Sequence, residues 1–111
     1  MPIISNRINA VVLVSTTQEI NTQIAAYTIV ESYADKILSV NTAIDVDVTL
    51  SGLISGQSVR VYQAGAGQIT FVNGTLTGRN TFNLTKTAGI YSIVDVSVIG
   101  TDAILTGNLS N

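Results

Sequence analysis

The sequence predicts an all-β protein, either a single antiparallel β-sandwich or a jelly-roll-like barrel of about eight to nine short strands. Short segments rich in Val, Ile and Thr recur along the chain, and the clearest, residues 44–50, alternates apolar and polar side chains. Turn signals containing Gly or Asn separate these segments at the spacing of about 8 to 12 residues that is typical of sandwiches and barrels. No window shows a sustained helical period, so we expect at most one helical turn, near residues 18–25.

Each expected strand has its own local pattern. In residues 44–50 the side chains of Asp45, Asp47 and Thr49 share one face, which leaves Ile44, Val46, Val48 and Leu50 for a buried face. Earlier in the chain we expect strands at residues 9–14, 26–31 and 37–41. After residue 50 the expected strands are residues 58–63, 68–73, 81–85, 90–99 and 103–106.

The glycine-rich stretch VYQAGAGQITF, residues 61–71, has two interpretations, a phosphate-binding loop or a bend. A phosphate-binding loop leads from a strand into a helix and is usually followed by Lys-Ser or Lys-Thr, whereas Gln68 and another expected strand follow here. We therefore predict a hairpin between residues 58–63 and 68–73, in which the glycines supply positive φ values. The predicted structural turn residues are Gly65, Gly67, Asn73 and Gly74.

The reactive side chains favour a protein that is not an enzyme and that holds no cofactor or metal. The chain contains neither Cys nor His, so a nucleophile such as Ser39 or Thr70 would need a Lys or carboxylate base, and none stands in a recognisable motif. Asp45 and Asp47 lie on one strand face and could share a calcium ion, but six or more oxygen ligands are needed. We expect this face to be solvated.

Charged residues form 11% of the chain, against about 25% in a typical soluble domain. The five cationic residues are scattered and the formal net charge is −2, which predicts no nucleic-acid binding. Low charge fits either a surface solvated through Ser, Thr, Asn and Gln or a surface covered by partner subunits. We favour partner subunits, because a soluble monomer usually carries more charge.

Three stretches resemble, in the same order, small β-domains of tailed-bacteriophage virion proteins. Residues 56–71, GQSVRVYQAGAGQITF, are similar to the run GxxVxVxQxGAGQVTF of those domains. Upstream, YTIV at 27–30 and ADKILSVNTA at 34–43 resemble their YTL and DAGKLIxVNSA runs. Downstream, GTDAILTGNL at 100–109 resembles their closing GTDxWLLxGDL, so the resemblance covers residues 26–111.

The chain also departs from the family pattern at particular positions. Asp35 and Lys36 lack the usual intervening glycine, and Leu50 stands where a strand-ending proline is common. Ala103 lies where a tryptophan neighbourhood is expected, and Asn108 replaces an aspartate. These changes predict altered surfaces at the loops and at the closing strand.

The resemblance implies a phage virion part, often a trimer, and it implies no catalytic residues. Because only some 25 residues precede the matching region, we expect a capsid decoration (cement) protein or a short head fibre that binds the major capsid protein. The alternative is a tail or fibre-tip module that binds a host receptor or glycan through Tyr62, Gln63 and the loops 64–67 and 73–80.

Residues 1–25 are expected to form an N-terminal arm with a first strand, ahead of one compact domain at 26–111. The arm carries neither a signal peptide nor a membrane span, which predicts synthesis in the host cytoplasm and assembly on the capsid surface without membrane contact. Its apolar residues are unusual for a terminus. The predicted subunit or capsid contacts are Ile3, Ile4, Val11 and Leu13.

Overall fold

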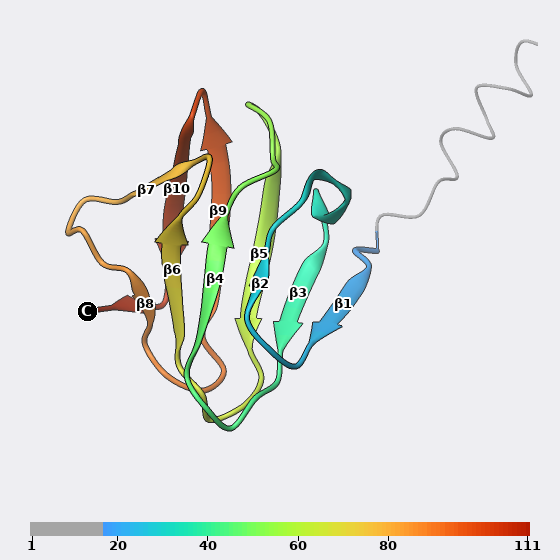
Figure 1. Cartoon of the computed structure of the whole chain (residues 1–111), viewed down its shortest axis with the longest axis vertical. Coiled ribbons are helices and arrows are strands. Elements are labelled where there is room, and N and C mark those ends of the chain that lie inside the picture. Colours follow the sequence, from blue (N-terminus) through green and yellow to red (C-terminus); the bar gives the residue numbers. More distant parts are fainter. Residues whose placement is uncertain (1–16) are drawn as a thin grey trace, which may run out of the picture.

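A computed structural model describes residues 17–111, and within this range the all-β prediction is confirmed (Figure 1). The described elements are β1 (Ile20–Gln23), β2 (Tyr27–Thr28), a 3-10 turn η1 (Glu31–Tyr33), β3 (Ile37–Val40), β4 (Val46–Leu50), β5 (Ser58–Gln63), β6 (Ile69–Asn73), β7 (Thr77–Arg79), β8 (Lys86–Thr87), β9 (Ile93–Ile99), β10 (Asp102–Gly107) and β11 (Leu109–Ser110). These strands form two sheets. Sheet A has the order β1-β3-β5-β9-β10-β7, and sheet B has the order β11-β8-β6-β4-β2.

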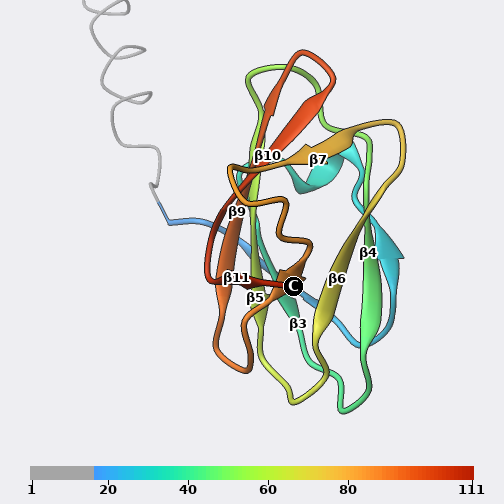
Figure 2. The ribbon, with the colours of Figure 1, turned by 90° about the vertical axis from the view of Figure 1, so that its left-hand side faces the viewer.

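From β1 to β6 the chain passes to the other sheet after every strand. As a result β1, β3 and β5 pair in parallel in sheet A, and β2, β4 and β6 pair in parallel in sheet B. Figure 2 shows the two sheets as two layers, with β5, β9 and β10 on one side and β4 and β6 on the other. This winding is solenoid-like, because each coil rests on the coil before it.

After β6 the chain continues both sheets mostly with antiparallel strands. β9 pairs with β5, β10 pairs with β9, and β8 and β11 extend sheet B, while β7 lies parallel to β10 at the far edge of sheet A. The prediction of a purely antiparallel fold is therefore wrong. Local alternation predicts a strand, but it says nothing about which distant strand supplies the hydrogen bonds.

The hydrophobic core lies between the two sheets. Alternate residues of the central strands point inward, as in β5, where Val59 and Val61 are buried while Arg60 is exposed. Burying one such Val or Leu side chain contributes about 1.5 to 3 kcal/mol. The other fully or almost fully buried apolar side chains include Leu38, Val40, Val48, Leu50, Ile69, Phe71, Val94, Val96, Ala103 and Leu105.

One predicted strand is absent from the described residues, because residues 81–85 form a loop between β7 and β8. Near residues 18–25, where at most one helical turn was expected, the chain forms β1. In the loop between β7 and β8 the Asn80 side chain accepts a hydrogen bond from the Leu84 N–H at 2.9 Å and donates to the Leu84 carbonyl at 2.7 Å. These bonds satisfy backbone groups that a strand would have used. The strand expected at residues 9–14 lies outside the described residues.

Gly65 and Gly67 have a different structural role from the one predicted. β5 belongs to sheet A and β6 to sheet B, so no hairpin joins them, and neither Gly65 nor Gly67 has a positive φ. The turn instead crosses directly over the preceding one, where a Cβ on Gly65 would lie 2.5 Å from the Thr42 carbonyl oxygen. A Cβ on Gly67 would overlap the Ile44 carbonyl. Glycine is needed here because two backbones approach closely.

Gly74, which follows Asn73 at the end of β6, lies in a comparable position. A Cβ on Gly74 would lie 2.6 Å from the Leu50 carbonyl oxygen, which accepts the Gly74 N–H at 3.1 Å. The Asn73 side chain accepts the Gly78 N–H at 2.9 Å and so holds the start of β7. At both ends of the coil, glycine therefore marks a turn that rests on the turn of the previous coil.

Candidate functional site

Four connections gather at one end of the molecule, the lower end in Figure 1, where β1, β3 and β5 finish and β9 begins. They comprise residues 24–26, 41–45, 64–68 and 88–91. We name this surface the turn face.

Backbone hydrogen bonds join the turns of this face in order. The Asn41 N–H donates to the Gln23 carbonyl at 2.9 Å, which links the first two turns. The Gly67 N–H donates to the Thr42 carbonyl at 2.8 Å, and the Tyr91 N–H donates to the Gln63 carbonyl at 2.7 Å. The four turns therefore form one continuous surface rather than separate loops.

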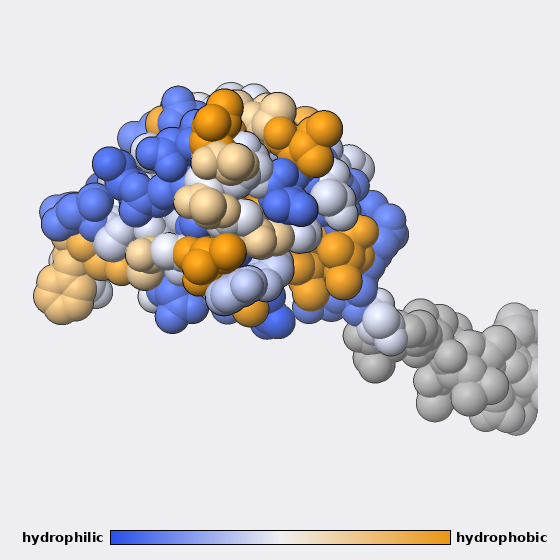
Figure 3. All heavy atoms as spheres, turned by 90° about the horizontal axis from the view of Figure 1, so that it is seen from below, coloured by the Kyte–Doolittle hydropathy of each residue, from blue (hydrophilic) through white to orange (hydrophobic). Residues whose placement is uncertain are grey.

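Apolar side chains dominate the turn face. Ile24, Ile44, Ile90 and Tyr91 are 78%, 73%, 47% and 68% exposed, although large apolar side chains are usually buried. Viewed from this end, apolar groups extend across the molecule and are interrupted by polar ones (Figure 3). Exposed apolar side chains that gather on one face are typical of interaction sites on soluble proteins. The exposed alanines of the face are Ala25, Ala26, Ala43, Ala66 and Ala88.

Asp45 is the one charged residue in the four segments, and its carboxylate is already engaged. Its Oδ1 accepts the Gln68 N–H at 2.8 Å, across the contact between two turns. Thr42 stiffens the same turn, because its Oγ1 accepts the Ile44 N–H and donates to the Ile44 carbonyl, both at 3.2 Å. Ile44 is thus held outward by a backbone that has little freedom to rearrange.

A buried polar cluster supports the turn face from inside. Gln63 is fully buried, and its Nε2 donates to the Gly65 carbonyl at 3.0 Å. Its Oε1 accepts the hydroxyl of Thr87, whose Oγ1 also accepts the Ile69 N–H at 3.0 Å. These bonds connect the two sheets. The prediction that Gln63 belongs to an exposed glycan-binding surface is therefore wrong, because its side-chain amide is buried and makes its hydrogen bonds inside the protein.

Tyr91 has a strained backbone, with φ at +71°. A bulky residue in the left-handed region is an outlier and costs about 1 to 2 kcal/mol. The short hydrogen bond from its N–H to Gln63 helps to hold this conformation. Strained residues of this kind cluster at functional sites, because the surrounding structure must maintain them.

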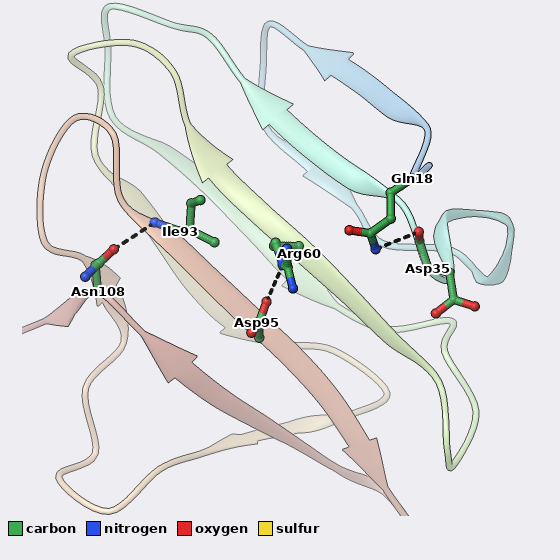
Figure 4. A network of polar contacts seen from close by, with 6 residues as sticks. All are labelled: Gln18, Asp35, Arg60, Ile93, Asp95 and Asn108. Atoms are coloured by element: carbon green, nitrogen blue, oxygen red, sulfur yellow. Dashed lines mark hydrogen bonds and ion pairs between the residues drawn. The ribbon is translucent and has the colours of Figure 1, made fainter. Parts of the chain in front are cut away.

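The outer face of sheet A offers a second, polar surface (Figure 4). Arg60 of β5 lies opposite Asp95 of β9, and the Arg60 Nε donates to the Asp95 Oδ1 at 2.9 Å. The Gln18 Nε2 donates to the Asp35 carbonyl at 3.0 Å, at the edge of the same sheet. A hollow of about 110 Å³ lies between these groups. Its two charges neutralise each other, so it presents neither a free acid nor a free base.

The remaining predicted positions do not form a site within the described residues. Within residues 17–111, Asp45 and Asp47 belong to no group of three or more His, Cys, Asp or Glu residues that could hold a metal ion. Ser39 lies on β3 and Thr70 on β6, in different sheets. The predicted contacts Ile3, Ile4, Val11 and Leu13 lie outside the described residues.

Searches against protein-family models, curated proteins and solved structures found no match to this chain. Within residues 17–111, no helix has the length and apolar character needed to cross a membrane.

The sequence-based prediction missed the turn face itself. A usable signal was present, because isoleucine and alanine occupy the connections at 24–26 and 41–45, where polar residues are usual. That these connections stack on one another, however, follows from pairings between strands that are far apart in the sequence.

Proposed function

We propose that this chain is a structural protein of a bacteriophage virion, a capsid decoration (cement) or short head-fibre protein that binds and stabilises the shell as an oligomer. The resemblance of residues 26–111 to phage virion β-domains motivates the proposal. The observation that carries it is the turn face, an almost uncharged apolar surface on a small, weakly charged protein. On this proposal the fold is a solenoid-like variant of the predicted β-sandwich or jelly-roll-like barrel.

The proposed mechanism is mechanical. A trimer seats at local threefold positions of the capsid lattice and clamps neighbouring copies of the major capsid protein. Burial of apolar surface supplies about 25 cal/mol per Å², less the cost of immobilising the partners. Three linked copies raise occupancy without a new kind of contact, because the second and third binding events become intramolecular.

The test is to purify the protein, determine its mass by multi-angle light scattering, and mix it with capsids that lack it. We expect an oligomer that sediments with the shell and reaches saturating occupancy. A protein that stays in the supernatant at every concentration would contradict capsid decoration. The tail or fibre-tip alternative would then be examined with a glycan array, in which Tyr62 and the loops at 64–67 and 73–80 remain the predicted contacts.

A further inference from the structure

We infer that the turn face is the surface through which copies of this chain bind one another. The inference rests on the proposed function, which includes an oligomer, and deepens it by naming the surface and the partner. It differs from the sequence-based expectation, which placed the contact in the N-terminal arm at Ile3, Ile4, Val11 and Leu13.

The distribution of exposed apolar side chains is the first argument. Within residues 17–111, Ile24, Ile44, Ile90 and Tyr91 share the turn face, and hydrogen bonds join the turns that carry them. Ile93, which is also exposed, begins β9 directly beside the turn face. The other large exposed apolar side chains are dispersed over the first edge strand, the opposite end of the molecule and the loop at 80–85. They are Ile20, Val30, Ile54, Phe82 and Ile99.

Charge is the second argument, and it selects the partner. A partner that is recognised by electrostatic complementarity must find charged groups of opposite sign on the surface it binds. The turn face offers only Asp45, whose Oδ1 already accepts the Gln68 N–H. A second copy of the same face brings an equally uncharged surface. The centres of protein interfaces are likewise depleted in charged residues and enriched in aromatic ones, as Tyr91 exemplifies.

Shape is the third argument. Successive turns are separated by the strand spacing of about 4.8 Å, so their side chains form a row across the end of the coil. Within the row, the exposed Ile24 and Ile44 are each next in sequence to an exposed alanine, Ala25 and Ala43.

Rigidity is the fourth argument. The Thr42 bonds to Ile44, the close crossing of Gly67 over Ile44 and the strained Tyr91 fix the face before any partner arrives. A preformed surface loses less conformational freedom on binding, so more of the gain from apolar burial remains as affinity.

The test uses Ile44→Asp in the full chain, with Ile99→Asp as the matched control. Both isoleucines are exposed, 73% and 67%, but Ile99 ends β9 away from the turn face. We expect Ile44→Asp to weaken association at least tenfold, so that light scattering shows monomers at concentrations at which the wild type and Ile99→Asp remain oligomeric. Circular dichroism and thermal unfolding check that both variants fold.

Tyr91→Gly provides a second variant that does not threaten folding, because glycine adopts the positive φ without strain. It should also weaken association, since it removes the exposed ring from the face. If Ile44→Asp does not fold, this variant decides the outcome: unchanged association would overturn the inference, and weakened association would support it.

The result for the inference is separable from the result for the proposed function. If folded Ile44→Asp remains oligomeric, the inference is overturned, and if that variant also loses shell binding, the face contacts the shell instead. If the wild type is monomeric at all concentrations, the inference is overturned as well. If the wild type is an oligomer and Ile44→Asp dissociates it, the inference stands. It stands even if the wild type does not bind capsids, a result that would contradict the proposed function.

Discussion

Tyr27 is a packed side chain whose hydroxyl group nevertheless lowers the free energy of unfolding. Its ring packs edge-to-face against Tyr33, with the ring centroids 6.1 Å apart, and contacts the core. Its hydroxyl is buried and has no hydrogen-bond partner among residues 17–111. Burial, and secondarily the nearby Tyr33, raise the pKa of Tyr27 above its ordinary value. An unsatisfied buried hydroxyl costs about 1 to 3 kcal/mol.

We expect Tyr27→Phe to leave the free energy of unfolding at neutral pH unchanged or to raise it by up to about 1 kcal/mol, because it removes this cost without changing shape. The raised pKa favours the neutral phenol in the folded state. Its contribution is therefore fully present below the unfolded pKa of about 10 and is lost as pH rises above it. Tyr27→Phe should reduce that alkaline loss.

Urea unfolding of the wild type and of Tyr27→Phe at about pH 8 and pH 11 measures both effects. Tyr33→Phe is the control, because the Tyr33 hydroxyl accepts a hydrogen bond from Gln23 Nε2 at 3.4 Å. Destabilisation of Tyr27→Phe by more than about 1 kcal/mol at pH 8 would mean that the hydroxyl has a partner in solution.

At the scale of elements, the turns decide the fold. The predicted hairpin would have returned the chain beside β5, whereas the turn at 64–68 carries it over the turn at 41–45 and into sheet B. The segment predicted as residues 58–63 coincides with β5, because alternation is a local property. The predicted pairing of this segment with the next strand is wrong, because β5 pairs instead with Ile37 to Val40, which lie more than twenty residues earlier.

Gly67→Ala should destabilise the protein by about 3 kcal/mol, because the added methyl group would overlap backbone rather than a movable side chain. Gly89→Ala is a matched control on the same face, since a Cβ there meets nothing within 4 Å. We expect this control to change stability by less than about 1 kcal/mol. Thermal and denaturant unfolding of both variants gives the comparison. Equal effects would show that the turns are not packed as described.

For the whole molecule, the proposed assembly involves the turn face and, by the sequence-based prediction, the N-terminal arm. Three salt bridges lie on the surface of the described residues, among them Arg60–Asp95 and Arg79–Asp102. Such exposed pairs contribute at most about 1 kcal/mol each, so the core and any subunit contacts dominate stability. Oligomerisation would then raise the apparent stability with protein concentration.

Deletion of residues 1–8 tests the arm separately from the turn face. If Ile3 and Ile4 contact the shell or another subunit, the shortened protein should coat expanded capsids with lower occupancy at equal concentration, because apolar contact area is lost. Densitometry of sedimented capsids, together with light scattering of the free protein, measures both roles. Unchanged occupancy and unchanged mass would contradict the prediction for the arm.

The sequence by itself determined the all-β character and the positions of strands such as β5, because the two-residue alternation of side chains is a property of neighbouring residues. It also excluded a metal site built from Cys or His. Only the tertiary structure decided that Gly65 and Gly67 serve close backbone approach, that Gln63 is buried, and that four connections form one apolar face. Each of these depends on which distant strands pair, and sheet pairing joins residues that local patterns do not relate.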